Sequence, residues 1–338
     1  MKKISVLLFS LILSVPVFAQ AGKLDKSAVR LKFAGVGGFY VSDWEKRNQN
    51  FNLVYNRVIE SNWQDQNKGT GVRFGVDYYA SLKNPLFTHL LFGANFSDLK
   101  GSFPTNRFNA NRIETLNYKA IQQQIEFTFG TVISVFDNFR VIPKFVHRTV
   151  NQDINSNTTM IIYDSVDAGF IRGREKIRSR DTSGFVGFGM EYDLTPNLSL
   201  YFDSLLLSNV LFISSGKYTY SKTAEGYLTS NGSIGVSNRF DDSTGTFKIS
   251  GNRFLLGVSL KASDSIRVFL SAERDTIYTN ISAPFGTNLL LVALLSSSGS
   301  SLTSDTINKT IIENIMYTQR QKYEATTLIL GVSKDLDI

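Results

Sequence analysis

Apolar and polar side chains alternate along four stretches of the chain, and turn-forming residues interrupt each stretch near its middle. In residues 182–203, Val186, Phe188 and Met190 alternate with small or charged side chains up to a turn at 195–197. A period of two places successive side chains on opposite faces of a β-strand, and Pro and Asn favour tight turns. The pattern predicts a long β-hairpin with one apolar and one polar face. It recurs in residues 71–97, 121–145 and 253–275, with turns at 83–85, 137–138 and 263–264.

One further strand is expected on each side of the four hairpins, at residues 28–41 and 322–336. The total is about ten strands, and twelve to fourteen are possible if strand pairs in the intervening segments reach a bilayer. These segments are polar and are predicted to be long loops, at residues 42–70, 99–117, 151–181, 214–251 and 276–320. The third contains an expected extra strand at 160–163 and is basic because of Arg172, Arg174, Lys176, Arg178 and Arg180.

The alternation fits both a soluble sandwich, with its apolar face inside, and a membrane barrel, with its apolar face toward lipid. The strands have roughly the 9–11 residues that a tilted strand needs to cross a bilayer, whereas ordinary strands have about 5–6. Connections are short at one end of the strands and long at the other, as in membrane barrels. The membrane barrel is therefore the favoured interpretation.

Residues 1–21 have the pattern of a cleaved signal peptide. Lys2 and Lys3 precede an apolar core at 4–15, and Ala19 and Ala21 form a small-residue cleavage site. One pattern runs through residues 22–338, which are predicted to form a single barrel domain. The chain contains no cysteine, so no disulfide staples it. The net charge is +7, but strand residues separate the basic residues, so nucleic acid is not an expected partner.

With its export signal, alternating strands and short turns at 83–85, 137–138, 195–197 and 263–264, the chain resembles the broad class of bacterial outer-membrane β-barrels. The resemblance implies an all-β, transmembrane, antiparallel up-and-down barrel in a Gram-negative outer membrane. Long loops are then extracellular and short turns periplasmic. Outer-membrane lipids and the barrel-assembly machinery are the implied partners. Barrels of this class usually end in an aromatic residue, whereas this chain ends in Ile338.

Charged residues on the polar face are the candidate functional residues, because this face lines the lumen of a membrane barrel. Two interpretations remain open: a charged channel lining that selects solutes, or a salt-bridged core that fills a narrow bore. The predicted lumen charges are Arg30, Lys32, Arg73, Asp77, Glu126, Arg140, Lys144, Glu191, Asp203, Arg253, Lys261, Arg267 and Glu273, and the same parity includes Arg148, Asp193 and Asp275.

The chain offers little catalytic or metal-binding chemistry. Its two histidines are His89, on the lumen face, and His147, on the lipid face, and nothing in the sequence places either one beside an Asp or Ser. A hydrogen-bonded structural role is therefore expected for both, with no catalytic residues, metal or cofactor. Residues 289–295 (LLLVALL) are apolar within a predicted loop, so they are expected to pack in a loop cap, plug the barrel mouth or contact a partner.

The leading functional hypothesis is porin-like passage of small polar solutes through a narrow charged lumen, without enzymatic activity. The alternative is a structural or surface-binding barrel with a filled, salt-bridged core, whose long loops contact a surface ligand. A third and weaker hypothesis is a surface hydrolase.

Overall fold

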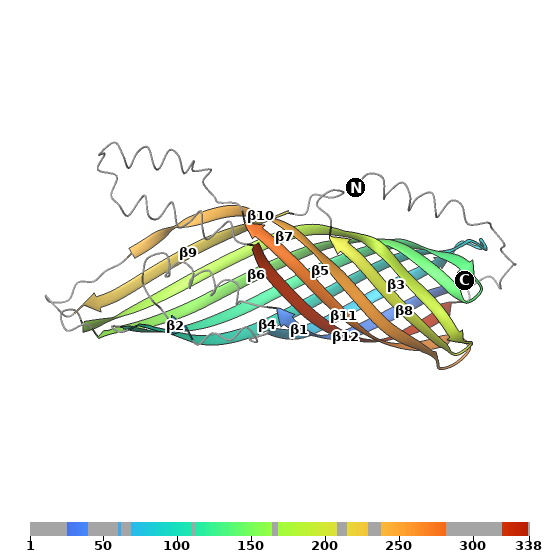
Figure 1. Cartoon of the computed structure of the whole chain (residues 1–338), viewed down its shortest axis with the longest axis horizontal. Coiled ribbons are helices and arrows are strands. Elements are labelled where there is room, and N and C mark those ends of the chain that lie inside the picture. The colour runs from blue at the N-terminus through green and yellow to red at the C-terminus, as the bar shows by residue number, and fades with distance from the viewer. Residues whose placement is uncertain are drawn as a thin grey trace, which may run out of the picture.

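The chain forms one antiparallel β-sheet that closes on itself in a computed structural model (Figure 1). The structure describes residues 26–39, 60–61, 69–109, 112–163, 168–207, 215–228, 238–281 and 320–336. The strands are β1 (Ser27–Phe39), β2 (Glu60–Ser61), β3 (Gly69–Ser81), β4 (Phe87–Asn109), β5 (Arg112–Phe136), β6 (Phe139–Tyr163), β7 (Ala168–Thr195), β8 (Leu198–Leu207), β9 (Ser215–Leu228), β10 (Asn238–Lys261), β11 (Ile266–Ile281) and β12 (Arg320–Leu336). Among the described residues, no helix is long and apolar enough to cross a bilayer.

Ten strand positions close the ring within the described part of the chain. Sequential neighbours pair from β1 through β3 to β7, and β10, β11 and β12 lead back to β1. Strands β8 and β9 share the position between β7 and β10: β8 pairs with residues 185–195 of β7, and β9 pairs with residues 169–182. The four hairpins and two single strands predicted from the sequence are therefore confirmed, as is the closed antiparallel barrel.

The barrel has an apolar outer surface and a polar interior at the end with the short turns. Outward-facing Leu256 and Leu328 are 64% and 59% exposed, whereas inward-facing Arg73, Glu126 and Arg253 are buried. A soluble protein has the reverse arrangement, and an apolar outer band is what a strand needs to face hydrocarbon. The side chains assigned to lipid by parity thus do form the outer belt.

On strand β5 the polarity of the two faces is reversed where the strand leaves this belt. On β5, Ile125 and Phe127 are exposed and Glu126 is buried, as in a membrane barrel. Nearer the strand's start, Lys119 is exposed while Tyr118 is completely buried, as in a soluble protein. Parity is unbroken, so only the chemistry of the two faces has changed. On β5 the reversal marks the outer edge of the apolar belt at residues 120–121.

Several predicted loops are therefore wrong, because the sheet continues past the belt. Residues 99–117 are largely the β4–β5 hairpin, and residues 151–181 belong mainly to β6 and β7. Residues 160–163 end β6 and are no additional strand, and the segment 214–251 contains β9 and half of β10. The sequence pattern concealed these extensions because their apolar residues face inward. The signal peptide (1–21) and the apolar segment 289–295 lie outside the described residues.

The extensions build a projection beyond the bilayer. A strand of 25 residues, such as β6, is about 80 Å long. At the usual tilt of roughly 40° it rises about 60 Å, which is twice the ~30 Å hydrocarbon thickness. The projection is formed by the upper parts of β4, β5, β6, β7, β9 and β10, and it extends to the left in Figure 1.

The two chemistries of the outer wall can be compared on one strand. We expect Leu256→Arg to lower the free energy of unfolding by about 2–4 kcal/mol, because it places a charge in hydrocarbon. Thr246→Arg, on the same face of β10 but beyond the belt, should leave stability nearly unchanged because Thr246 is exposed to water. Denaturant titration of both variants in lipid vesicles measures the difference. Equal losses would show that the apolar belt does not end below Thr246 on β10.

Candidate functional site

Five charged side chains meet in the middle of the lumen, and we call them the central charged layer. They are Arg73 on β3, Glu126 on β5, Arg253 on β10, and Glu273 and Asp275 on β11. Arg253 Nη2 lies 2.6 Å from Glu126 Oε1 and its Nε lies 2.6 Å from Asp275 Oδ1. Arg73 pairs with Glu273. Since β10 and β5 lie four positions apart in the ring, the Arg253–Glu126 pair spans the bore.

All members of the central charged layer are buried, and Glu126 is only 1% exposed. A buried ion is stable only when it is paired and its remaining hydrogen-bonding capacity is used. The layer satisfies this condition: Arg253 donates to both Glu126 oxygens and to both Asp275 oxygens, and Gln124 Nε2 donates to Glu126 at 2.6 Å. The sequence placed Arg73, Glu126, Arg253 and Glu273 on one face, and the structure brings them together.

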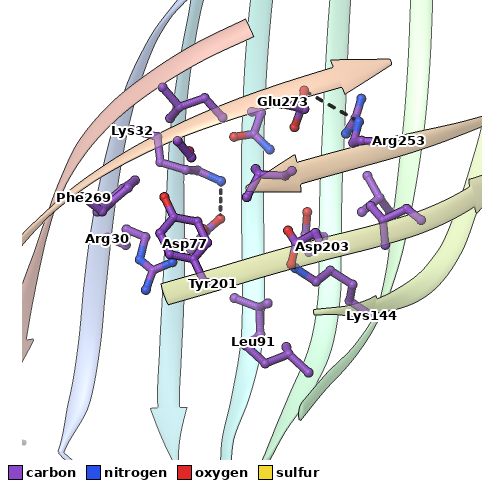
Figure 2. A pocket seen from close by; sticks show the side chains of 18 of the residues that line it. Arg30, Lys32, Asp77, Leu91, Lys144, Tyr201, Asp203, Arg253, Phe269 and Glu273 are labelled. Atoms are coloured by element: carbon purple, nitrogen blue, oxygen red, sulfur yellow. Dashed lines mark hydrogen bonds and ion pairs between the residues drawn. The ribbon is translucent and has the colours of Figure 1, made fainter. Parts of the chain in front are cut away.

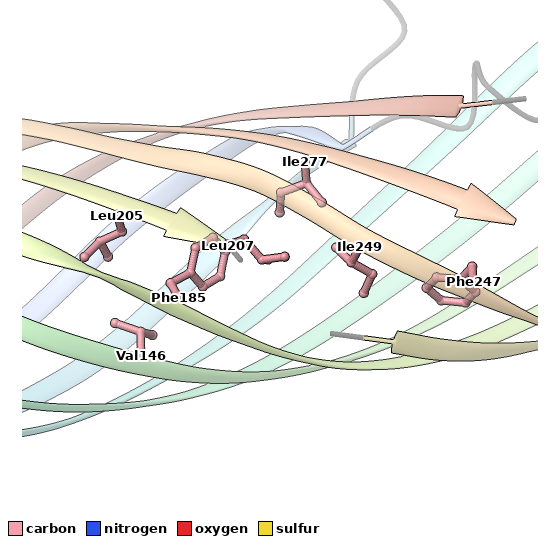
Figure 3. Close-up of a cluster of buried hydrophobic side chains, with 7 residues drawn as sticks. All are labelled: Val146, Phe185, Leu205, Leu207, Phe247, Ile249 and Ile277. Carbon is pink, nitrogen blue, oxygen red and sulfur yellow. The ribbon is translucent and has the colours of Figure 1, made fainter. Parts of the chain in front are cut away.

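An apolar cluster lies on the extracellular side of this layer (Figure 3). The Phe185 ring connects the two, because its centroid lies 4.9 Å from the Arg253 guanidinium carbon and 5.3 Å from that of Arg148. Such cation–π contacts let an aromatic ring pack directly on a charged group. The cluster packs apolar side chains of β6, β7, β8, β10 and β11 together in the interior of the barrel. Its members are Val146, Phe185, Leu205, Leu207, Phe247, Ile249 and Ile277.

Arg30 lies among aromatic rings in the periplasmic half of the lumen. Its guanidinium carbon lies 4.8, 5.1 and 5.9 Å from the centroids of Phe269, Tyr79 and Tyr201. Two inward-facing glycines make room for these rings: a Cβ on Gly257 would collide with Tyr201, and a Cβ on Gly331 would collide with Phe269. The parity rule had placed Arg30 in the lumen, but it did not single out the aromatic residues around it.

Several other lumen charges form pairs along the wall (Figure 2). Lys32 and Asp77 connect neighbouring strands at 2.7 Å, and Lys144 reaches Asp203 at 2.7 Å over the intervening β7. Gly189 on β7 permits this contact, since a Cβ there would meet both side chains. In a further group, Arg140 pairs with Asp193 at 3.1 Å and Glu191 at 3.4 Å.

Two predicted lumen charges lie outside this interior network. Lys261 pairs with Asp264 at 2.9 Å in the exposed β10–β11 turn. Arg267 donates a hydrogen bond to Ser199 at 3.2 Å near the periplasmic end, well below the central charged layer. Alternation identifies the face of a strand but not the height of a residue in the barrel, so Arg267 does not belong to the paired core expected from sequence.

The part of the lumen that described residues line includes two small cavities. The upper one, about 100 Å³, borders the central charged layer and the Lys32–Asp77 pair. The lower one, about 120 Å³, opens among His89, Arg267 and Asp335. Both are lined by Arg30 and Tyr79, and each has polar groups in its lining and room for several water molecules.

His89 is fully engaged in hydrogen bonding near the lower cavity. Its Nε2 lies 3.0 Å from the Lys26 carbonyl and its Nδ1 lies 3.1 Å from the Thr88 hydroxyl. Within the described residues, no group of three His, Asp or Glu side chains is placed to hold a metal ion.

A closed ring of tilted strands with an apolar outer belt and paired charges inside meets the requirements for spanning a bilayer, because the ring has no free sheet edge and the paired charges face away from lipid. The chain has the fold of bacterial outer-membrane β-barrels. The resemblance predicted from the sequence is thus confirmed at the level of this broad class.

No protein-family model and no curated protein sequence matches the barrel. Solved structures that resemble it include the outer membrane protease OmpT from Escherichia coli, with 7% identity, 95% of this chain and 100% of that chain covered, and a TM-score of 0.45. Ail, the attachment invasion locus protein of Yersinia pestis, has 10% identity, coverages of 93% and 100%, and a TM-score of 0.27. A major outer membrane protein from Thermus thermophilus has 11% identity, coverages of 91% and 99%, and a TM-score of 0.27.

The central charged layer should contribute strongly to stability. We expect Glu126→Gln to lower the free energy of unfolding by about 3 kcal/mol or more, because it leaves Arg253 buried without one of its partners. Asp264→Asn removes the partner of Lys261 in an exposed turn, where water screens the pair, and should have no measurable effect. Heat-modifiable gel mobility and denaturant titration measure both. A similar, small effect of the two substitutions would show that the lumen is wet.

Proposed function

We propose that this outer-membrane barrel is closed to solutes and binds an extracellular ligand through the projection above the bilayer. The observation that carries the proposal is the filled lumen. The Arg253–Glu126 pair crosses the bore, and the apolar cluster around Phe185 packs against Arg253 on the extracellular side. A solute entering from either end would have to break buried ion pairs or displace packed apolar side chains. Both are costly, so a closed resting state is expected.

The projection supports a binding role because the membrane does not require it. Crossing the bilayer takes about 9–11 residues per strand, whereas β5 and β6 have 25 each. The additional length is folded as a packed sheet, with Leu116 and Tyr118 completely buried on its inner face. Ordered backbone held this far from the bilayer offers a rigid surface to a partner. The arrangement of charges in the lumen gives no comparable support to a catalytic role.

Conductance tests the closed lumen directly. Wild-type protein in planar bilayers should pass almost no current, since the Arg253–Glu126 pair crosses the bore. The double variant Arg253→Ser, Glu126→Ser removes the pair that spans the bore and should produce a measurable leak while remaining folded by heat-modifiable mobility. The double variant also shows that the assay detects an opened barrel. A steady, reproducible wild-type conductance would overturn the proposal.

Porin-like passage of small polar solutes is the second candidate, and the two cavities favour it. They lie one below the other and share Arg30 and Tyr79 as lining residues, so movement of the Arg30 side chain would connect them. On this candidate the wild type conducts, and Arg30→Gln shifts the selectivity toward cations because it removes a positive charge from the path. On the closed-barrel proposal Arg30→Gln leaves the current at baseline, since the central charged layer and apolar cluster remain.

A further inference from the structure

Five basic residues occupy successive outward-facing positions on β7, and we call them the basic stripe. They are Arg172, Arg174, Lys176, Arg178 and Arg180. The sequence places them in a basic segment that was predicted to be a loop. As part of β7 they lie on the outer wall of the projection, on the face that carries Phe188 within the belt. Four of the five are exposed and Lys176 is half-buried.

The strands on either side offset the basic stripe only in part. On β6 its five register partners include a single acid, Asp153, whose Oδ2 lies 3.5 Å from Arg178 Nε in an exposed pair. On β9 its partners include one acid, Glu225 opposite Arg172, and one base, Lys217 opposite Arg180. The other partners on the two strands are Asn151, Asn155, Asn157, Thr159, Thr219, Ser221 and Thr223. Among the described side chains of β6 and β7 the surface is therefore a line of cations, in excess over acids, with amides and hydroxyls of β6 beside it.

Packing of the barrel does not require this row of like charges. The opposite parity of β7 faces the interior, as buried Ser183 and Phe185 just below the stripe show, so the outward positions are free to carry any polar residue. Exposed like charges about 6.6 Å apart repel one another modestly. A row that opposes folding, even weakly, is best explained by a partner with complementary charge.

The length of the basic stripe indicates the shape of that partner. Five alternate positions span about 26 Å along the strand, or roughly 20 Å of height at the usual tilt. The polar headgroup region on one side of a bilayer is only about 5–8 Å thick. A lipid headgroup could therefore reach the lowest residues near Arg180 but not Arg172. The stripe fits an extended polymer that runs outward along β7.

The neighbouring side chains indicate its chemistry. Proteins that bind single-stranded nucleic acid place aromatic rings beside the basic groups so that bases can stack on them. The β6 partners of the basic stripe are instead Asn, Asp and Thr, which hydrogen-bond hydroxyl groups. We propose that the basic stripe on β7 binds an acidic polysaccharide, with carboxylate or sulfate groups on the Arg and Lys side chains and sugar hydroxyls on β6. The proposal rests on the proposed binding function and names its ligand class.

The test uses full-length protein folded into vesicles of zwitterionic phosphatidylcholine and a fluorescent heparin oligosaccharide as the probe. The stripe variant is Arg174→Gln, Arg178→Gln, Arg180→Gln. The control variant is Lys100→Gln, Lys248→Gln, Arg274→Gln, which removes the same charge from exposed positions on β4, β10 and β11. The stripe variant should weaken binding roughly ten- to a hundredfold, as expected for three exposed ion pairs, and the control variant only slightly. Wild-type affinity should fall as salt rises.

Several results would overturn the proposal. Equal losses in the two variants would indicate non-specific attraction by net charge. A single-stranded oligonucleotide that binds as tightly as heparin and depends equally on the stripe would indicate a nucleic-acid site. Loss of heparin binding when anionic phospholipids are added to the vesicles would indicate a headgroup site. Absence of wild-type binding would also reject the proposal.

The conductance and binding measurements are independent. Wild-type current together with stripe-dependent heparin binding would reject the closed lumen but keep the polysaccharide site. A closed barrel that binds no polysaccharide would reject the site and leave the closed lumen intact.

Discussion

Backbone hydrogen bonding is the constraint from which the rest of this structure follows. A strand in hydrocarbon has no water to satisfy its N–H and C=O groups, so the sheet must close into a ring without edges. In the closed ring, each side chain points either toward the lipid or toward the bore. Ten strand positions enclose a bore that is wider than the eight-stranded barrels whose side chains just fill it. Long side chains such as Arg253 are therefore needed to reach the opposite wall, and the chain uses them.

Filling the bore with charges has a structural advantage over filling it with apolar residues. If both faces of each strand were apolar, a one-residue slip in register would exchange the lipid and lumen faces at little cost. With Arg73, Glu126 and Arg253 on one face, the same slip would place unpaired charges in hydrocarbon. We interpret the central charged layer as a device that specifies register, at a desolvation cost that the ion pairs offset. The glycines opposite Tyr201 and Phe269 also help to fill the bore. Large and small residues must alternate across a narrow bore, and these glycines leave room for the two rings.

The strands could be predicted from the sequence, but the specific side-chain contacts between them could not. Alternation predicted ten strands and the lumen face correctly because it depends only on neighbouring residues. It missed the projection because the polarity of the two faces reverses at residues 120–121 of β5, and a search for apolar outer residues stops there. The Arg253–Glu126 pair joins residues 127 apart in the chain, and it depends on barrel width and register. The aromatic surroundings of Arg30 were indicated in the sequence only indirectly, by aromatic residues at strand positions that face the lumen.

The reversal of face polarity on β5 also explains how one sheet can face lipid within the bilayer and water beyond it. Within the bilayer the outer wall must be apolar, so charged groups can be placed only in the bore, where they become paired and inaccessible. Beyond the bilayer the bore is packed with apolar residues such as Leu116 and Tyr118, and the outer wall is released for charged ones. A row of cations in excess over neighbouring acids is possible only in this second region. Recognition of a charged partner is therefore expected on the outer wall of the projection, where the strands below hold it rigidly above the membrane.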